Sequence, residues 1–433
     1  MRNLKRTPFI ASVILLAYMP FHIFLSQWLS QATGGLEAWK IGKDLALFAA
    51  TLFTICLVFW KGKGNRAFNI LLILTAAYGA LHLLLWAFNP DIYKRSAELG
   101  VIYNMRLPLY VLLGYGAALL YPKFAFSSLT KVILGVSTIV TIFGIVQYFL
   151  PGDFLTHFGY GVDRGARAAF YIDDNRDLPV RIMSTLREPN ALGAYLILPA
   201  TALAALILRA KERRKQLMMG AALFLHLIAI LLTQSRSALV GVVLALSLLG
   251  WWQYQSWIMP RLKRFWPALA ALVVLLGAGV YVMRDSAFVE SYIVHSQKDE
   301  TVSDLDSNDY HVLFVKKGLE GIKDQPLGHG PGTAGLASIQ NPEGSFLTEN
   351  YYIQIGYEIG VLGLAVFLAI NVWVYVRLRQ SGDPWANILL ASFWAYVLTN
   401  MLLHTWSNEA VVTQWWLLAG LLIARQPKRP EAL

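Results

Sequence analysis

The first residues that could do chemistry lie in the stretch IAILLTQSRSALVGVVLAL, residues 228–246, where Arg236 interrupts an almost wholly apolar run. No acidic residue lies within twenty positions of it on either side. A guanidinium at the edge of a hydrocarbon phase costs several kcal/mol unless it is paired or faces water. Ser235 and Ser237 can cap the following helix and leave backbone N–H groups facing an anion. Arg236 is therefore a candidate phosphate ligand; the alternative is a side chain that reaches lipid headgroups or an acid in an outer loop.

A second arginine has the same setting in STLREPNALGAYLILPA, residues 184–200. Arg187 comes just before Pro189, a residue type favoured in the first turn of a helix, and Asn190 follows in that turn. Arg181 lies one or two turns further back. Two arginines at two helix N-termini on one face predict a site for a polyanion such as a pyrophosphate. Arg181 is then a further candidate ligand, and Asn190 a candidate positioning residue.

The third element is SFLTENYYIQIGYEIGVLGLAVFLAI, residues 345–370, where a long loop meets an apolar run. Glu349 and Asn350 stand at the junction, and Glu358 lies further along, inside the apolar run. A carboxylate at the mouth of a pocket could act as a general base or orient an acceptor hydroxyl. The alternative is structural: Glu349 favours the N-terminus of the helix, and Thr348 caps it.

The elements that must position these residues are membrane-spanning helices. Of 433 residues, 56% are hydrophobic and 15% are charged, whereas soluble domains carry about a quarter charged residues. Apolar runs long enough to cross roughly 30 Å of hydrocarbon recur along the chain. We therefore expect an all-α polytopic membrane protein with about twelve transmembrane helices and a large extracytoplasmic loop subdomain. The expected spans lie near residues 8–28, 45–60, 68–88, 107–121, 128–150, 189–208, 216–234, 237–252, 266–283, 351–376, 385–403 and 410–424.

These spans divide the chain into three parts. Residues 1–283 hold helices one to nine, with an outer loop near 151–188, residues 284–350 form the extracytoplasmic subdomain, and residues 351–433 hold helices ten to twelve. Within the subdomain, apolar residues at helical spacing in NDYHVLFVKKGLEGIKD predict an amphipathic helix. The glycines and prolines of QPLGHGPGTAGL then end it.

The distribution of basic residues predicts how these spans are oriented in the membrane. The short basic clusters RNLKR, KGKGNR and RAKERRK all fall on one side of the arrangement, and the positive-inside rule places that side and the N-terminus in the cytoplasm. The candidate residues then lie on the outer face of the membrane. The same bias accounts for most of the net charge of +11. Because no basic face interleaved with aromatic residues appears, we expect membrane lipids and not nucleic acid as partners.

The order of the pieces R-x-PN, SRSALVG, PLGHGPG, EN and E-x-G-x-x-G-L, from about residue 180 to 365, resembles the O-antigen ligase/polymerase superfamily of bacterial envelope glycan assembly. The resemblance implies a metal-independent glycosyltransferase without a cofactor, acting at the outer face of the bacterial inner membrane. It implies a donor glycan carried on undecaprenyl pyrophosphate. The acceptor would be a lipid-linked glycan for a polymerase, or lipid A-core or another acceptor for a ligase.

Carried over to this chain, the resemblance implies that Arg187 and Arg236 bind the donor pyrophosphate and stabilise the leaving group. The acceptor hydroxyl would attack with inversion. Ligases of the superfamily typically carry a histidine immediately before the asparagine that matches Asn350. This chain has Glu349 there, which looks more like polymerase or exopolysaccharide members.

Three histidines complete the candidate site. His329 in PLGHGPG is an alternative to Glu349 as the catalytic base. His311 stands near a position where many relatives carry a basic residue, so the resemblance makes it a candidate donor contact. His404 lies in an expected outer turn and is a candidate positioning residue for the acceptor, together with Asn350.

The leading interpretation is a polymerase of lipid-linked repeat units, and the alternative is a ligase that transfers a finished glycan. A third hypothesis from another class is a transporter or flippase of an anionic lipid-linked substrate. Transporters tend to place charges near the midplane on broken helices, often in repeated halves. Here the charges gather at the outer face and no internal repeat is apparent, which favours an enzyme.

Overall fold

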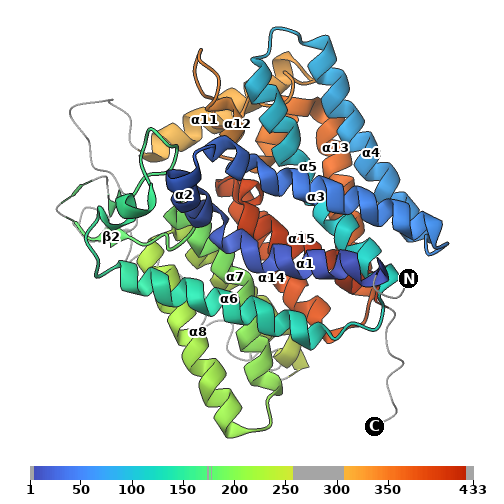
Figure 1. The fold of residues 1–433 in the computed structure, drawn as a ribbon, viewed down its shortest axis with the longest axis vertical. Helices are drawn as coiled ribbons and strands as arrows, with labels where there is room; N and C mark the ends of the chain where they lie inside the picture. The colour runs from blue at the N-terminus through green and yellow to red at the C-terminus, as the bar shows by residue number, and fades with distance from the viewer. Residues whose placement is uncertain (1–3, 173–174, 177, 257–306, 426–433) are drawn as a thin grey trace, which may run out of the picture.

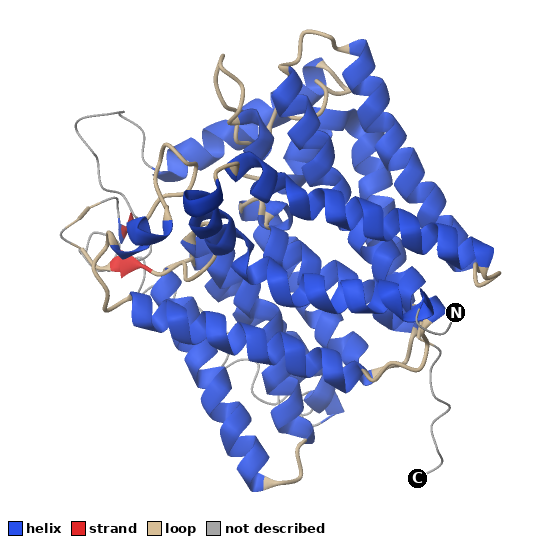
Figure 2. Cartoon of the chain, in the orientation of Figure 1, coloured by secondary structure: helices blue, strands red, loops and turns tan. Residues whose placement is uncertain are grey.

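The computed structural model describes residues 4–172, 175–176, 178–256 and 307–425 of the chain. These ranges form a bundle of helices, and their strands are one short antiparallel pair, β1 (Phe170–Tyr171) and β2 (Val180–Arg181) (Figure 2). Nine helices of the described part are long and apolar enough to cross a membrane. The protein is thus an all-α polytopic membrane protein, as its composition predicts.

Figure 1 follows the chain through its elements. The first half contains α1 (Thr7–Tyr18), α2 (His22–Thr33), α3 (Leu36–Trp60), α4 (Arg66–Phe88), α5 (Lys94–Leu120) and α6 (Phe126–Gln147). The second half contains α7 (Pro189–Arg209), α8 (Arg213–Thr233), the helix Arg236–Ser256 (called the Arg236 helix below), α11 (Ser307–Asp324), α12 (Gly335–Ser338), α13 (Tyr351–Gln380), α14 (Pro384–Leu402) and α15 (Glu409–Ile423). Short 3-10 helices are η1 (Leu4–Arg6), η2 (Met19–Phe21), η3 (Phe154–Phe158) and η6 (Thr405–Ser407).

The predicted spans correspond to these helices wherever the chain is described. The first span is continuous from Leu4 to Thr33 through α1, η2 and α2. Two helices, α5 and α15, are not among the nine, because α5 is less apolar and α15 is shorter. The predicted span at 266–283 lies outside the described residues. The amphipathic helix predicted in the outer loop is confirmed as α11.

Two helices begin earlier than the apolar runs indicate. The runs start near residues 45 and 107, but α3 begins at Leu36 and α5 at Lys94. The predicted starts are wrong because charged residues interrupt the apolar pattern there. In the structure Lys43, Asp44 and Arg106 are buried against one another, and Glu37 and Glu98 pair with Arg95 nearer the surface, so the helices continue through these charges.

The centre of the bundle is the pair α5 and α15, whose backbones touch (Figure 1). A Cβ atom at Gly420 would lie 2.2 Å from the carbonyl oxygen of Val111, and one at Gly114 would lie 2.3 Å from that of Leu417. Small residues at helix interfaces allow such close approach in membranes, where packing rather than water exclusion drives association. This contact fixes α15, whose first residues border the candidate site.

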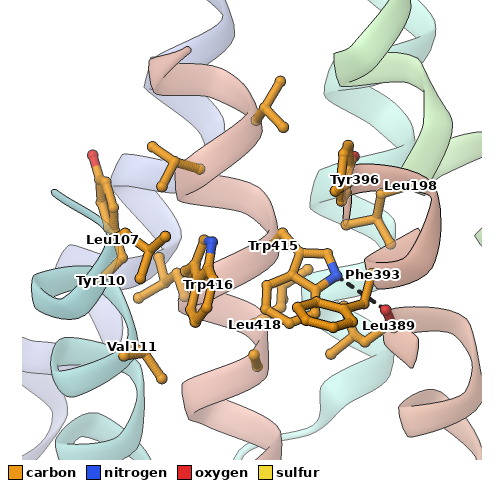
Figure 3. Close-up of a cluster of buried hydrophobic side chains, with 14 of the residues drawn as sticks. Leu107, Tyr110, Val111, Leu198, Leu389, Phe393, Tyr396, Trp415, Trp416 and Leu418 are labelled. Atoms are coloured by element: carbon orange, nitrogen blue, oxygen red, sulfur yellow. Dashed lines mark hydrogen bonds between the residues drawn. The ribbon is translucent and has the colours of Figure 1, made fainter. Parts of the chain in front are cut away.

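Aromatic side chains fill the space around α15. Trp406, Trp415 and Trp416 are all buried, and the rings of Trp415 and Trp416 are 4.8 Å apart. Figure 3 shows Trp415 beside Phe393 of α14, with its indole N–H donating to the carbonyl of Leu389 at 3.0 Å. This hydrogen bond satisfies a polar group that hydrocarbon could not. The packing ties α14 to α15.

The helix α13 is kinked where the PLGHGPG loop packs against it. Ile359 and Gly360 have non-helical backbone angles, and the φ of Gly360 is 71°. A Cβ on Gly360 would lie 2.4 Å from the carbonyl carbon of Leu327 in the loop. Only glycine therefore fits both the angle and the space.

Glu358 fastens this loop to the kink. Its carboxylate accepts hydrogen bonds from Asn104 Nδ2 at 2.6 Å and from the backbone N–H of Gly332 at 3.1 Å. Its carbonyl accepts from the N–H of Gly330 at 2.8 Å. Glu358 is fully buried. It therefore does not stand at the mouth of a pocket, where a carboxylate could act as a general base. It joins α5, the loop and α13.

The close contact of α5 and α15 yields a stability prediction. Substituting Gly420→Ala pushes a methyl group into the backbone of α5, and we expect a loss of about 1–3 kcal/mol of unfolding free energy. The matched control is Gly220→Ala in α8, where a Cβ meets nothing within 4 Å and the higher helix propensity of alanine should be neutral or stabilising. Thermal unfolding in detergent measures both. Equal melting temperatures for the two variants would contradict the packing.

Candidate functional site

Two helices begin beside each other at one end of the bundle, α7 after Arg187 and the Arg236 helix after α8. The contact depends on Gly193 of α7, where a Cβ would lie 2.6 Å from the Cβ of Ala238 and 3.1 Å from Thr233 Oγ1. The glycine lets α7 touch the beginning of the neighbouring helix. Both predicted arginines therefore lie at adjacent helix N-termini.

The chain reverses between α8 and the Arg236 helix in two residues. Gln234 has a φ of 52°, a left-handed conformation uncommon for a residue other than glycine. Ser235 Oγ accepts a weak hydrogen bond from the N–H of Ala238 at 3.4 Å and lies 3.1 Å from Ser237 Oγ. The predicted tight turn and the capping role of Ser235 are confirmed. Arg236 leaves this turn with an exposed side chain.

Arg181 joins the end of α8 to the start of α7. Its Nε donates to the carbonyl oxygen of Thr233 at 3.0 Å, and its Nη2 donates to Asn190 Oδ1 at 3.1 Å. Thr233 is the last residue of α8, so Arg181 satisfies a carbonyl at a helix end. Strand β2 thus holds the outer loop against both helices (Figure 1).

A large cavity of about 670 Å³ opens at this junction. It brings together five of the predicted site residues from four separate stretches of sequence. Its lining residues are Arg181, Asn190, Gln234, Arg236, Ser237, His311, Val312, Val315, Glu349, Met401, Leu402 and Leu403. A lining that combines cations, amides and a carboxylate with aliphatic side chains suits an amphipathic ligand.

A small cavity of about 200 Å³ adjoins the large one, and both are lined by Asn190, Glu349 and Leu403. Its other lining residues are Tyr103, Arg106, Arg187, Glu188, Ala191, Ala194, Leu336, Leu347, His404, Thr405, Ser407, Asn408 and Glu409. Arg187 thus lines the small cavity and Arg236 the large one. Arg187 and Arg236 therefore lie on the two sides of the boundary that the cavities share.

Arg187 differs from the nearby arginines in its hydrogen bonding. It is partly buried, and among the described residues its guanidinium forms no hydrogen bond or ion pair. Arg181 and Arg106, by contrast, hold protein acceptors. A guanidinium on a cavity wall without a protein acceptor suits an anionic ligand.

Glu349 stands on the boundary of the two cavities in a strained conformation. Its φ is 52°, and Oε2 lies 3.7 Å from His311 Nδ1. Burial raises the pKa of the Glu349 carboxyl, and the negative charge of Glu188 raises it further. Positive φ at a non-glycine residue costs of order 1–3 kcal/mol and tends to occur at functional sites.

The two nearby histidines are neutral at neutral pH. Burial lowers the pKa of His311, and the Arg236 guanidinium adds to that effect. Burial, with a smaller contribution from His311, lowers the pKa of His404 to about 4. Thr348 donates its hydroxyl proton to the carbonyl of Asn350, so His404 Nε2, at 3.3 Å, is the donor to Thr348 Oγ1. Neutral imidazoles add no positive charge to the site, so its cationic groups are the arginines.

Two predicted site residues line neither cavity. The ring of His329 stacks on the ring of Tyr357, with ring centroids 3.9 Å apart. The backbone N–H of His329 donates to the carbonyl of Tyr357. Asn350 caps α13, because its Oδ1 accepts from the N–H groups of Tyr352 and Ile353 at 2.9 and 3.1 Å. Its Nδ2 donates to the carbonyl of Met401. Asn350 therefore holds Glu349 at the helix start and ties α13 to α14.

Sequence analysis missed a buried ionic network at the edge of the small cavity. Arg106 donates from Nε and Nη2 to the two carboxylate oxygens of Asp44, at 2.7 and 2.8 Å. Glu409 Oε1 lies 3.7 Å from Arg106 Nη1 and 3.5 Å from Lys43 Nζ. The guanidinium carbon of Arg106 lies 4.2 Å from the centre of the Tyr103 ring. The available signal was the presence of charged residues directly before three of the predicted apolar runs, those that start near residues 45, 107 and 410.

The described residues contain no group of three or more histidine, cysteine or acidic side chains that could hold a metal ion. Where it is described, the outer site therefore offers arginines, one boundary carboxylate and neutral histidines. Such groups can bind an anion and accept a proton.

The fold and site define a polytopic membrane protein with an arginine-lined cavity at one end of its helices. Residues 221–368, about a third of the chain, match the family model described as O-antigen ligase. This match supports the resemblance of the chain to the O-antigen ligase/polymerase superfamily. No curated protein matches the chain. The matched segment contains Arg236, His311, His329, Glu349 and Asn350.

The charge interaction between Glu188 and Glu349 gives a prediction about the pH at which Glu349 titrates. Replacing Glu188→Gln removes a negative charge that raises the pKa of Glu349, so the titration of Glu349 should move to lower pH. Infrared titration of the protonated carboxyl band measures it, with Glu349→Gln identifying the band. Burial raises the pKa of Glu188 as well, and the positive charges of Arg187 and Arg181 oppose this effect only in part. An unchanged Glu349 titration would show that the two carboxyls do not interact.

Proposed function

We propose that the protein is an inverting, metal-independent glycosyltransferase that polymerises oligosaccharide repeat units carried on undecaprenyl pyrophosphate. The reaction takes place at the outer face of the bacterial inner membrane, with the N-terminus in the cytoplasm. The basic clusters at the opposite helix ends support this orientation. The superfamily match supports the lipid-linked glycan as substrate.

The observation that carries the proposal is the pair Arg187 and Arg236 at adjacent helix N-termini. They line two cavities that meet at Glu349 and Asn190. A diphosphate that reaches across this boundary contacts a guanidinium on each side. The helix N-termini add partial positive charge where the leaving group becomes more negative. The apolar wall of the large cavity, with Val312 among its residues, suits the lipid end of the donor.

The chemistry follows from these positions. The acceptor hydroxyl oxygen forms a bond to the anomeric carbon on the face opposite the pyrophosphate, and the bond to the pyrophosphate oxygen breaks. The electron pair goes to the pyrophosphate, held by Arg187 and Arg236, and the hydroxyl proton goes to Glu349. Undecaprenyl pyrophosphate leaves, and the glycan is longer by the transferred chain. His404 and Asn190 position the acceptor, and Arg181 and His311 support the donor side.

The second candidate function is a ligase that transfers a finished glycan to lipid A-core or another acceptor. The observation that favours it is the description of the matching family model, O-antigen ligase. Glu349, in place of the histidine typical of ligases, favours the polymerase. Both reactions use the same donor and leaving group, so only the acceptor distinguishes them.

Arginine-to-lysine exchange tests the donor site. Arg187→Lys and Arg236→Lys keep the charge but lose the planar fork that binds phosphate oxygens in pairs. We expect each to lower turnover by about 100-fold or more, the usual effect of removing a donor to developing charge. The assay follows glycan transfer by the purified protein from a synthetic undecaprenyl-pyrophosphate oligosaccharide. Arg213→Lys, an exposed residue of α8, is the control. Retained turnover in both site variants would rule out the diphosphate site.

Glycan length in a deletion strain separates the two candidates. A missing polymerase should leave glycans capped by a single repeat unit, because joining stops while attachment continues. A missing ligase should leave long chains that are not attached to their acceptor. Gel analysis of extracted glycans, with complementation by the wild-type chain, gives the answer. Normal length and normal attachment would contradict both functions.

A further inference from the structure

The largest of the cavities considered lies at the opposite end of the helices from the candidate site. It has a volume of about 1000 Å³. It forms where α3, α5 and α15 end and α4, α6 and α14 begin, which is the cytoplasmic end in the proposed orientation. Its lining residues are Lys63, Asn65, Ala118, Leu119, Pro122, Lys123, Phe124, Ala125, Phe126, Ser127, Trp385, Ala424 and Arg425. We call it the basic cavity.

Among the described residues, three cations from three separate segments of the chain line the basic cavity, and no acidic residue does. Arg425 is paired with Asp383 at 3.2 Å, outside the lining. Within the described part of the chain, neither Lys63 nor Lys123 forms an ion pair. Two positive charges therefore remain unbalanced at the wall. The positive-inside rule accounts for their sign but not for their convergence on one cavity.

The remaining wall is aromatic and aliphatic. Phe124 and Phe126 are buried, and the rings of Phe126 and Trp385 lie 5.3 Å apart. These last two residues also line a narrow apolar crevice that continues among α6, α7 and α14, lined further by Ile133 and Leu198. A cationic mouth that leads into an apolar crevice matches a molecule with an anionic head and a hydrocarbon tail.

We propose that the basic cavity binds the phosphate headgroup of an anionic phospholipid of the inner leaflet, with the start of an acyl chain against the aromatic wall of the cavity. Basic pockets between transmembrane helices on the cytoplasmic side bind such headgroups in other membrane proteins. Lys63 and Lys123 contact the phosphate, and the Phe126–Trp385 pair contacts the first part of the chain. The site is independent of glycan transfer, because it uses none of the residues of the outer site.

The test compares lipid binding by two double variants that each remove two positive charges. Lys63→Gln/Lys123→Gln removes the cavity charges, whereas Arg213→Gln/Arg214→Gln removes exposed charges at the start of α8. The purified full chain is titrated with phosphatidylglycerol, phosphatidylcholine or inorganic phosphate, and bound lipid is counted by native mass spectrometry. Wild type should prefer phosphatidylglycerol. The cavity variant should lose roughly 30-fold in affinity for it, and the control should lose little.

Several outcomes would overturn the proposal. Equal binding of phosphatidylglycerol and phosphatidylcholine would show that no headgroup is selected. Equal losses in both double variants would assign the preference to general surface charge. Inorganic phosphate that displaces the lipid and binds as tightly would identify a free anion as the ligand. Unchanged melting temperatures of the variants without lipid establish that a loss of binding is not a loss of fold.

Discussion

Charged side chains can stay at the edge of a hydrocarbon phase only when they have partners, and this electrostatic requirement organises the outer end of the protein. Arg106 meets it with the carboxylates of Asp44 and Glu409, and Arg181 meets it with a helix-end carbonyl and Asn190. Arg187 differs, because its guanidinium lines a cavity without such an acceptor among the described residues. Arginines with protein partners thus lie beside one whose setting suits an anionic ligand.

Close backbone packing makes this arrangement possible. Gly193 brings the start of α7 against the turn before Arg236, and Gly420 brings α15 against α5. A side chain at either position would separate helices whose ends carry the site. The positive ends of two helix dipoles consequently point at one region, where they reinforce the arginines. The site therefore stands on helices rather than on flexible loops, as precise positioning of a leaving group requires.

Glu349 connects the two cavities chemically as well as spatially. Burial and Glu188 both favour its protonated form, so it holds a proton more readily than an exposed carboxyl does. That property suits a group that receives a proton from a hydroxyl. Polymerase and ligase chemistry share this proton transfer and the diphosphate leaving group. The difference between the two functions therefore rests on the acceptor, and the small cavity with its ionic network is the region of the site where an acceptor would bind.

The sequence by itself determined the membrane class, the approximate spans, the tight turn before Arg236 and the superfamily, because hydropathy and short motifs are local properties. It also predicted Arg187, Arg236 and Glu349 as site residues from their types and their places at helix starts. Only the tertiary structure decided that Glu358 is a buried fastening for a glycine loop, that His329 stacks on Tyr357, and that Arg106 is neutralised by acids from two other helices. Those partners lie far away along the chain, and a charge in an apolar run has the same sequence pattern whether its partner is a distant carboxylate or a bound phosphate.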